Sequence, residues 1–480
     1  MSSELVMAID IGSSSVRASL YDANARSIPG TESRIERTFG RGLDGSSELS
    51  ASRASDEVVE VIDGCLSRSS SVEGEIAHIA IACFWHSMLG LDADGIPTSP
   101  VIGWADTRSA EFTARLRSDL DESLVHDRVG ARFHSSYWPA KLLRLRESER
   151  EREVWTQTTH WVSFSDFLGL RLTGVLSTGT SMASGTGLYD LRQHGWDSKL
   201  LTYLGFDATR LPCLSDEPTR LSSAYCERWP RLADASFAAP IADGVANTIG
   251  SGCTSRSRAA LMLGTSGALR VMYEGEPPVH IPSGLWCYRV DDKRVIVGGA
   301  LSDCGNLIAK FVDELNLRFD WMTQLESTAP VLDAGLVMPF YFGERSTGYH
   351  ENAHGDVLGG DGQGNIGILR AAMEGVAFRF AEILDQLESI LPIEEIVISG
   401  GAMREIPIWG QIIADVLGRD LGVSAESEAT SRGAALYTLK IDEKPQPIER
   451  SIGFDASNHV IYQQLRLRHR RAYGEHFGHQ

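Results

Sequence analysis

The sequence predicts an α/β fold made of two related domains. Residues 7–22 read M-A-I-D-I-G-S-S-S-V-R-A-S-L-Y-D, an apolar strand, a Gly/Ser tip and a second strand, which is the pattern of a β-hairpin. Residues 259–274 repeat this hairpin, and the two copies align without a gap. A chain of 480 residues is also too long for one hydrophobic core. We therefore expect a first domain over residues 1–242 and a second over residues 243–480.

The tip of the first hairpin has the composition of a phosphate site. Gly12 lets backbone N–H groups approach a ligand closely, and Ser13 and Ser14 add hydroxyl donors. Asp10, at the end of the first strand, would repel a phosphate unless a cation lay between them, which predicts Mg²⁺ at Asp10. An ordinary hairpin with a solvated aspartate is the alternative.

The second hairpin differs from the first at a position that matters for metal binding. Its Gly264 aligns with Gly12 and is followed by Thr265, whereas Met262 aligns with Asp10. Two phosphate-binding tips with one metal-binding carboxylate predict a nucleotide held between the two domains. Chance similarity is the alternative, because Gly/Ser turns are common in hairpins.

Aromatic and polar side chains follow two of the predicted strands, at residues 76–82 and 101–104. In α/β folds, ligands bind at the carboxyl ends of strands. Aromatic rings cover the apolar face of a sugar, and polar groups bind its hydroxyls or a carboxylate. Each side chain could singly belong to the core, but together they predict a sugar pocket. The candidates are Trp85, His86, Trp104, Asp106 and Arg108.

Asp243 is the second carboxylate of interest. It precedes a helix-like run of small residues, so the helix dipole should keep it ionised. An ionised aspartate can orient a hydroxyl and receive its proton late in a loose phosphoryl-transfer transition state. The alternative is that Asp243 only caps the helix.

The rest of the chain alternates between further strands and helices, as an α/β fold requires. Buried strands are predicted at 295–299 and 396–398, and the latter runs into S-G-G-A at 399–402. Apolar spacing predicts the helices, which we expect at 55–67, 109–124, 139–155, 161–172, 196–204, 303–315, 369–389, 407–417, 430–439 and 461–477.

Composition excludes several classes of protein. A net charge of -19 argues against a nucleic-acid-binding surface. Seven cysteines without a C-x-x-C pair argue against a disulfide framework and a zinc site, and favour reduced thiols. No stretch approaches the roughly 20 apolar residues of a membrane span, and no apolar leader is visible. We therefore expect a cytoplasmic protein with a small-molecule substrate.

Nearly the whole chain resembles the FGGY family of carbohydrate kinases. The matching motifs follow the family's order and spacing. They are A-I-D-I-G-S-S-S-V-R, W-H-S-M-L-G-L-D, V-I-G-W-A-D-T-R, Y-W-P-A-K-L-L, A-D-G-V-A-N, L-G-T-S-G-A, G-E-R-S-T-G, S-G-G-A and W-G-Q-I-I-A-D-V-L-G.

The resemblance implies two actin-like, RNase H-like ATPase domains with the catalytic cleft between them. It implies transfer of the γ-phosphate of ATP to a sugar hydroxyl with Mg²⁺, Asp10 as the carboxylate on the metal side and Asp243 as the catalytic base. The implied nucleotide contacts are Gly12, Ser13, Ser14 and Arg17 in the first phosphate loop, Gly264 and Thr265 in the second, Gly305 at the ribose, and Gly401 and Ala402 at the adenine.

Within the family, W-H-S-M-L-G-L-D and G-E-R-S-T-G are most similar to the gluconate kinases. Xylulokinases tend to have glycine where this chain has Ser87. Arg108 or Arg345 could pair with the carboxylate of an aldonate, so D-gluconate is the expected substrate. Two departures weaken any substrate assignment: Arg144 stands where the family usually has tryptophan, and Ala242 where it often has glycine.

Three alternatives differ in function. One is a pentulose kinase of the xylulokinase or ribulokinase type, since related kinases accept different sugars through a few pocket residues. A sugar-sensing relative would bind without catalysis, but this chain has both Asp10 and Asp243. A chaperone-like or filament-forming ATPase would have the phosphate hairpins without the sugar motifs. The sequence leaves the oligomeric state open and is compatible with a homodimer.

Overall fold

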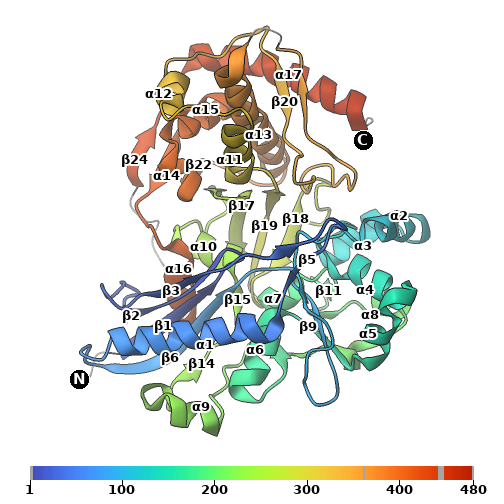
Figure 1. Ribbon diagram of the computed structural model, residues 1–480, viewed down its shortest axis with the longest axis vertical. Helices are drawn as coiled ribbons and strands as arrows, with labels where there is room; N and C mark the ends of the chain where they lie inside the picture. The colour runs from blue at the N-terminus through green and yellow to red at the C-terminus, as the bar shows by residue number, and fades with distance from the viewer. Residues whose placement is uncertain (1–3, 361–362, 442–447, 478–480) are drawn as a thin grey trace.

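Two β-sheets form the cores of the protein, one above the other in Figure 1. The computed structural model describes residues 4–360, 363–441 and 448–477. The first sheet has the strand order β14-β6-β1-β2-β3, with β15 also paired to β6. Its strands are β1 (Glu4–Ile11), β2 (Ser15–Asp22), β3 (Ser33–Glu36), β6 (Glu75–Cys83), β14 (Ser236–Phe237) and β15 (Ile241–Ala242).

The second sheet repeats the arrangement at the centre of the first. Its order is β18-β19-β17-β16-β22-β23-β24. Strand β16 pairs antiparallel with β17 and parallel with β22, as β1 pairs with β2 and β6. The two predicted hairpins are therefore confirmed. The strands are β16 (Arg258–Leu263), β17 (Gly267–Glu274), β18 (Trp286–Arg289), β19 (Arg294–Leu301), β22 (Glu395–Ser399), β23 (Leu421–Ser424) and β24 (Ile448–Ile452).

Strand β1 is buried over almost its whole length because helices cover both faces of its sheet. Helix α1 (Ala51–Arg68) packs against β2, and α16 (Ala429–Leu439) packs against β1 and β6. A strand covered on both faces has a continuous apolar run rather than an alternating one. This explains the run V-M-A-I at the start of the chain.

Helices α10 (Asp243–Gly250) and α16 cross closely, and both pack into the first core. A Cβ atom on Gly433 would lie 1.8 Å from the Ala246 carbonyl oxygen, and one on Gly250 would lie 1.8 Å from that of Ala429. The predicted boundary at 242/243 therefore falls before a helix that packs with the first domain. The chain also returns to that domain through α16.

Three predicted elements have different ends. The helix predicted at 109–124 is divided into α2 (Ala110–Asp119) and α3 (Glu122–Val129), because the Asp121 side chain caps a new helix. The one predicted at 139–155 is divided into α4 (Trp138–Glu147) and α5 (Arg152–Gln157). Residues 161–172 begin as β9 (His160–Val162), and α6 (Phe164–Thr173) starts after a capping box.

The long helices at the carboxyl-terminal end lie where the sequence predicts them. These are α13 (Gly364–Glu388), α15 (Pro407–Leu417) and α17 (Ala456–Phe477). The other helices are α7 (Thr180–Ser184), α8 (Ser198–Leu204), α9 (Ser223–Arg228), α11 (Gly305–Glu314), α12 (Trp321–Glu326) and α14 (Gly401–Glu405). Short strands are β4 (Gly40–Arg41), β5 (Ser47–Leu49), β7 (Leu89–Leu91), β8 (Val101–Ile102), β10 (Ser177–Thr178), β11 (Tyr189–Asp190), β12 (Gly195–Trp196), β13 (Cys213–Leu214), β20 (Leu336–Met338) and β21 (Asp356–Leu358).

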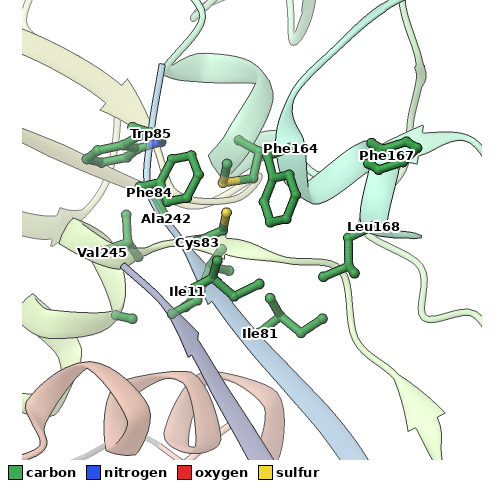
Figure 2. Packing of buried hydrophobic residues seen from close by; sticks show 14 of the residues in the cluster. Ile11, Ile81, Cys83, Phe84, Trp85, Phe164, Phe167, Leu168, Ala242 and Val245 are labelled. Atoms are coloured by element: carbon green, nitrogen blue, oxygen red, sulfur yellow. The ribbon is translucent and has the colours of Figure 1, made fainter. Parts of the chain in front are cut away.

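Apolar packing holds the carboxyl ends of β1 and β6 in place. Figure 2 shows Ile11 and Ile81 below Cys83 and Phe84, with Val245 of α10 on one side. The Phe84 ring stacks on that of Phe164, with centroids 5.8 Å apart. These packed side chains lie next to the residues that follow β6, Trp85 and His86, which belong to the predicted sugar pocket.

Candidate active site

A cavity of about 210 Å³ is lined by residues that follow strands of the first sheet and by residues of the second sheet. Ser13 comes from the first hairpin tip, Asp243 begins α10, which packs with the first domain, and Met262, Ser266 and Arg270 come from the second hairpin. The cavity therefore lies between the two domains, next to both predicted phosphate tips. Its aromatic residues are Phe84, Trp85, Trp104, Tyr137, Trp286, Tyr288 and Tyr349.

The aromatic rings form a connected wall. Trp286 stacks on Tyr288 with centroids 4.7 Å apart, and Trp85 meets the Tyr288 ring edge-on at 4.9 Å. The Tyr137 and Tyr288 hydroxyls are 2.6 Å apart, so one hydrogen-bonds the other across the two domains. Such a surface suits the C–H face of a sugar while the hydroxyls keep the wall partly polar.

His86 lines the cavity as a neutral side chain. Burial lowers its pKa to about 3. Its Nδ1 lies 2.6 Å from the Gly185 carbonyl oxygen, which can only accept, so Nδ1 has the proton and Nε2 is a hydrogen-bond acceptor. The backbone of His86 is left-handed, with φ of 66°, and the Lys141 ammonium donates to its carbonyl oxygen at 2.8 Å. These contacts fix the ring so that Nε2 can accept from a substrate hydroxyl.

Asp243 is the first residue of α10, and Ala242 occupies the cap position. The side chain accepts from its neighbour's N–H, that of Gly244, at 2.6 Å. Burial raises its pKa, while Arg270 and Arg345 oppose that shift. Asp243 thus stands one residue inside the helix rather than at its cap position, and its carboxylate accepts from an N–H of the first turn while it lines the cavity.

Two arginines also line the cavity, the buried Arg270 and the half-buried Arg345. Arg345 follows β20, stacks over the Trp104 ring at 4.4 Å and donates to the Leu301 carbonyl oxygen at 2.9 Å. Arg270 lies in β17, and among the described residues its guanidinium has no ion pair and its buried Nε no hydrogen-bond partner. Burial lowers the pKa of Arg270 to about 10 and also lowers that of Arg345. Buried cations in this state favour an anionic ligand.

Asp106 and Arg108 do not join the other sugar-pocket candidates. Asp106 is fully buried and accepts from Arg108 at 2.7 Å and from Arg144 at 3.1 Å. Arg108 also pairs with Glu48 at 2.5 Å. In the part of the chain that the structure describes, neither side chain lines the cavity that holds Asp243. Arg144, which stands where the family usually has tryptophan, thus belongs to an ion-pair cluster beside the site. In this cluster Arg108 is already paired with the carboxylates of Asp106 and Glu48.

Asp10 is buried at the end of β1, 3.3 Å from the Arg17 Nε, and Arg17 also pairs with Glu428. Burial raises the pKa of Asp10 to about 7; Arg17 opposes the shift, and the nearby carboxylates of Asp243 and Glu428 add to it. A buried carboxylate whose pKa is raised despite a neighbouring arginine, with further carboxylates close by, fits a site for a divalent cation. Among the described residues, no group of three or more His, Cys, Asp or Glu could hold a metal ion. Phosphate oxygens would therefore supply further ligands, as is usual for Mg²⁺.

The remaining nucleotide candidates meet at the second hairpin tip. The Gly305 N–H donates to the Gly264 carbonyl oxygen at 2.9 Å, and a Cβ atom on Gly305 would lie 3.3 Å from the Ala402 Cβ. A Cβ atom on Gly401 would meet no atom within 4 Å, so space is open above the start of α14. A second cavity, of about 230 Å³, is lined by Ser13, Ser14 and Thr265 among others. Both tips therefore face one space next to this group.

Family models match both halves of the chain. The N-terminal domain of the FGGY family of carbohydrate kinases matches residues 5–222, and the C-terminal domain matches residues 259–439. The chain belongs to the FGGY family of carbohydrate kinases. Two relatives are a gluconokinase of Bacillus subtilis, 23% identical over 90% of this chain and 87% of its own length, and a xylulose kinase of Escherichia coli, 27% identical over 83% and 85%.

Solved structures confirm the predicted fold class. A gluconate kinase from Lactobacillus acidophilus superposes with a TM-score of 0.89 at 22% identity, covering 99% of this chain and 98% of that one. The FGGY kinase thus has the two-domain, actin-like ATPase fold. It is a phosphotransferase that uses ATP as the donor and an alcohol group of a small-molecule sugar as the acceptor. No helix in the described ranges is long and apolar enough to cross a membrane.

Sequence reasoning missed several residues of this FGGY kinase's cavity. Tyr137 begins the motif Y-W-P-A-K-L-L and Tyr349 directly follows G-E-R-S-T-G, but neither was predicted as a site residue, while Trp286 and Tyr288 lie in β18, outside the quoted motifs. Arg270 had a readable signal, a lone arginine inside the apolar strand G-A-L-R-V-M-Y, because arginine is rarely buried without a partner.

Proposed function

We propose that this kinase phosphorylates a sugar acid, most simply D-gluconate, at a hydroxyl held against Asp243. The observation that supports this choice is the pair of arginines in the cavity next to Asp243, the buried Arg270 and the half-buried Arg345. With a neutral sugar the Arg270 guanidinium would have only the Asp243 carboxylate as an anionic neighbour, whereas an aldonate carboxylate would pair with it directly.

Each residue of the cavity has a role in this proposal. The aromatic wall around Tyr288 covers the carbon chain of the sugar acid, and His86 Nε2 accepts from one of its hydroxyls. Asp243 accepts the proton of the reacting hydroxyl as the phosphoryl group is transferred. Arg270 and Arg345 bind the carboxylate, which orients the chain so that the reacting hydroxyl lies toward Asp243.

The first hairpin tip and Asp10 serve the nucleotide in this proposal. Backbone and hydroxyl donors of Gly12, Ser13 and Ser14 bind phosphate oxygens of ATP, and Asp10 holds Mg²⁺. When bound, the ion neutralises phosphate charge during transfer. The adenosine lies beside the second tip, with Gly305 at the ribose and Gly401 and Ala402 at the adenine, where the space above Gly401 is open. We also propose a cytoplasmic location, since the structure contains all seven cysteines as free thiols.

A pentulose kinase is the second candidate. It is favoured by the Escherichia coli xylulose kinase, whose 27% identity exceeds the 23% of the Bacillus subtilis gluconokinase. A pentulose would use the same aromatic wall and Asp243 but offer no carboxylate to the arginines.

An acceptor panel tests the proposal directly. ADP formation from ATP and Mg²⁺ is measured with gluconate, xylulose, ribulose and glycerol under one set of conditions. We expect gluconate to have a kcat/KM roughly two to three orders of magnitude above that of the neutral acceptors. A neutral ketose that outperforms gluconate would overturn the substrate assignment, and the absence of ADP formation with every acceptor would favour a sugar-sensing relative.

A further inference from the structure

The loop that supplies Arg345 to the cavity is held from behind by a buried carboxylate. Residues 343–350 contain Arg345 and Tyr349, both of which line the cavity. Glu344, the residue before Arg345, is 2% exposed and lies on the side of the loop that faces the rest of the domain. Its side chain accepts from the loop's own N–H groups, at Gly348 (3.2 Å) and His350 (3.3 Å).

Two side chains from distant helices complete the shell of this carboxylate. Arg379 of α13 donates to Glu344 at 2.7 Å and to the Thr347 hydroxyl of the same loop at 2.8 Å. Tyr473 of α17 donates its hydroxyl to Glu344, with the two carboxylate oxygens at 2.8 and 2.9 Å. The Arg379 guanidinium also stacks over the Tyr473 ring at 4.5 Å.

Aromatic contacts dock the end of α17 on the same loop. The Phe477 ring stacks on that of His350 with centroids 5.3 Å apart, and it meets Phe340 at 5.5 Å. Figure 1 shows α17 running across the top of the second domain to the end of the chain, past β20. Helix α17 thus contacts the cavity-lining loop at 343–350, which lies more than a hundred residues earlier in the sequence.

We propose that Tyr473 is a positioning residue for substrate binding, which acts through Glu344 to hold Arg345 in the cavity. The carboxylate joins Tyr473 and Arg379 on one side to the loop backbone on the other. Loss of the tyrosine hydroxyl removes a donor from a buried carboxylate, and such hydrogen bonds to charged groups are among the stronger ones in proteins. The loop then samples positions in which Arg345 no longer meets the substrate. The inference rests on the proposed function only in taking this cavity as the acceptor site.

The chain contains a matched control on the same two helices. Tyr462 of α17 donates to the buried carboxylate of Glu374 at 2.9 Å, and Arg370 of α13 donates to that carboxylate at 2.8 Å. Tyr462 and Tyr473 are separated by about three helical turns, so they lie on one face of α17. This second Arg–Glu–Tyr cluster has the same chemistry, but its glutamate lies inside α13, away from the 343–350 loop.

The experiment compares Tyr473→Phe with Tyr462→Phe in the full chain, using the best acceptor of the panel. Each variant is expected to lose some thermal stability. Tyr473→Phe should raise the KM for the acceptor about tenfold, with kcat and the KM for ATP changed less than about twofold. Tyr462→Phe should leave all three constants near those of the unsubstituted enzyme. Equal KM values for the two variants, or an equal loss of kcat, would reduce Tyr473 to a structural role and overturn the proposal.

Hydrogen exchange gives a readout that does not depend on activity or on the identity of the substrate. The N–H groups of Gly348 and His350 donate to Glu344, so their exchange should accelerate in Tyr473→Phe and not in Tyr462→Phe. Unchanged exchange would overturn the positioning role, even if gluconate proves to be the substrate. Failure of gluconate in the panel overturns the substrate assignment and leaves this comparison valid with another acceptor.

Discussion

Arg108 and Asp106 form an ion pair at 2.7 Å, beside the cavity that holds Asp243 rather than within it. Asp106 has Arg144 as a second cationic partner, and Arg108 has Glu48 as a second anionic one. The two residues therefore satisfy each other's charge within a small cluster. The cations available to a substrate carboxylate are instead Arg345, which the G-E-R-S-T-G motif predicts, and Arg270, which no motif marks.

Arg270→Gln should discriminate between charged and neutral acceptors. Removing the guanidinium should lower kcat/KM for gluconate by roughly two to three orders of magnitude, because the carboxylate loses its charged partner in the cavity. Neutral acceptors should be affected far less. Steady-state kinetics with gluconate and xylulose measure both effects, and Arg108→Gln is the control, expected to leave the ratio of the two kcat/KM values unchanged. An equal loss for both acceptors would mean that Arg270 serves Asp243 rather than the substrate.

Asp243→Asn should abolish most turnover while leaving ligand binding intact. The asparagine keeps the size of the side chain but cannot receive the proton of the acceptor hydroxyl, so kcat should fall by about two to four orders of magnitude. Calorimetric titration with ATP and with the acceptor, done on the same preparation, should give affinities within a few-fold of those of the unsubstituted enzyme. Turnover close to normal in this variant would exclude Asp243 as the base.

Gly433→Ala should destabilise the first domain strongly, because the added methyl group would lie 1.8 Å from the Ala246 carbonyl oxygen. Neither backbone can yield without separating α10 from α16. Asp243 begins α10, so activity should fall together with stability. Thermal unfolding is the measurement, with Gly169→Ala in α6 as the control, since a Cβ atom there would meet no atom within 4 Å. A variant that unfolds at the normal temperature would show that the helices do not cross at this distance.

The hairpins and most long helices could be predicted from the sequence because their signals are local. The strand β1 is an apolar run that ends at a Gly/Ser tip, and its copy in β16 and β17 makes the repeat visible. The breaks at Asp121 and Ser148 were missed because charged residues continue the helical spacing across them. Capping by a single side chain decided where the first of these new helices begins.

The candidate site was predictable only where a motif pointed to it. Trp85, His86 and Asp243 follow strand ends, and the structure brings them to one cavity. The placement of Arg270 and Tyr288 depends on β17 and β18 facing the first domain, which no local pattern encodes. The pairing of Arg108 with Asp106 likewise depends on which partner is nearer in space, and that is a property of the folded chain.

Asp10→Asn tests whether this carboxylate binds the metal ion, separately from its effect on the stability of the native state. In the enzyme with Mg²⁺ and ATP, the variant should lose most turnover and most of the stabilisation that the ligands give, because the ion loses its protein ligand. Differential scanning fluorimetry with and without MgATP measures the second effect. Equal stabilisation of the variant and the unsubstituted protein would mean that Asp10 does not hold the ion.

In a chelating buffer without nucleotide, the same variant should become relatively more stable as pH rises. Burial raises the pKa of Asp10 in the native state to about 7, above its unfolded value of 3.8. The unfolded chain therefore loses this proton first, and the native state loses stability between about pH 4 and pH 7 on account of Asp10. Asparagine has no proton to lose, so the Tm of the variant minus that of the unsubstituted protein should increase from pH 5 to pH 8. A difference that stays constant over this range would show that Asp10 is already ionised at pH 5, with Arg17 compensating for its burial.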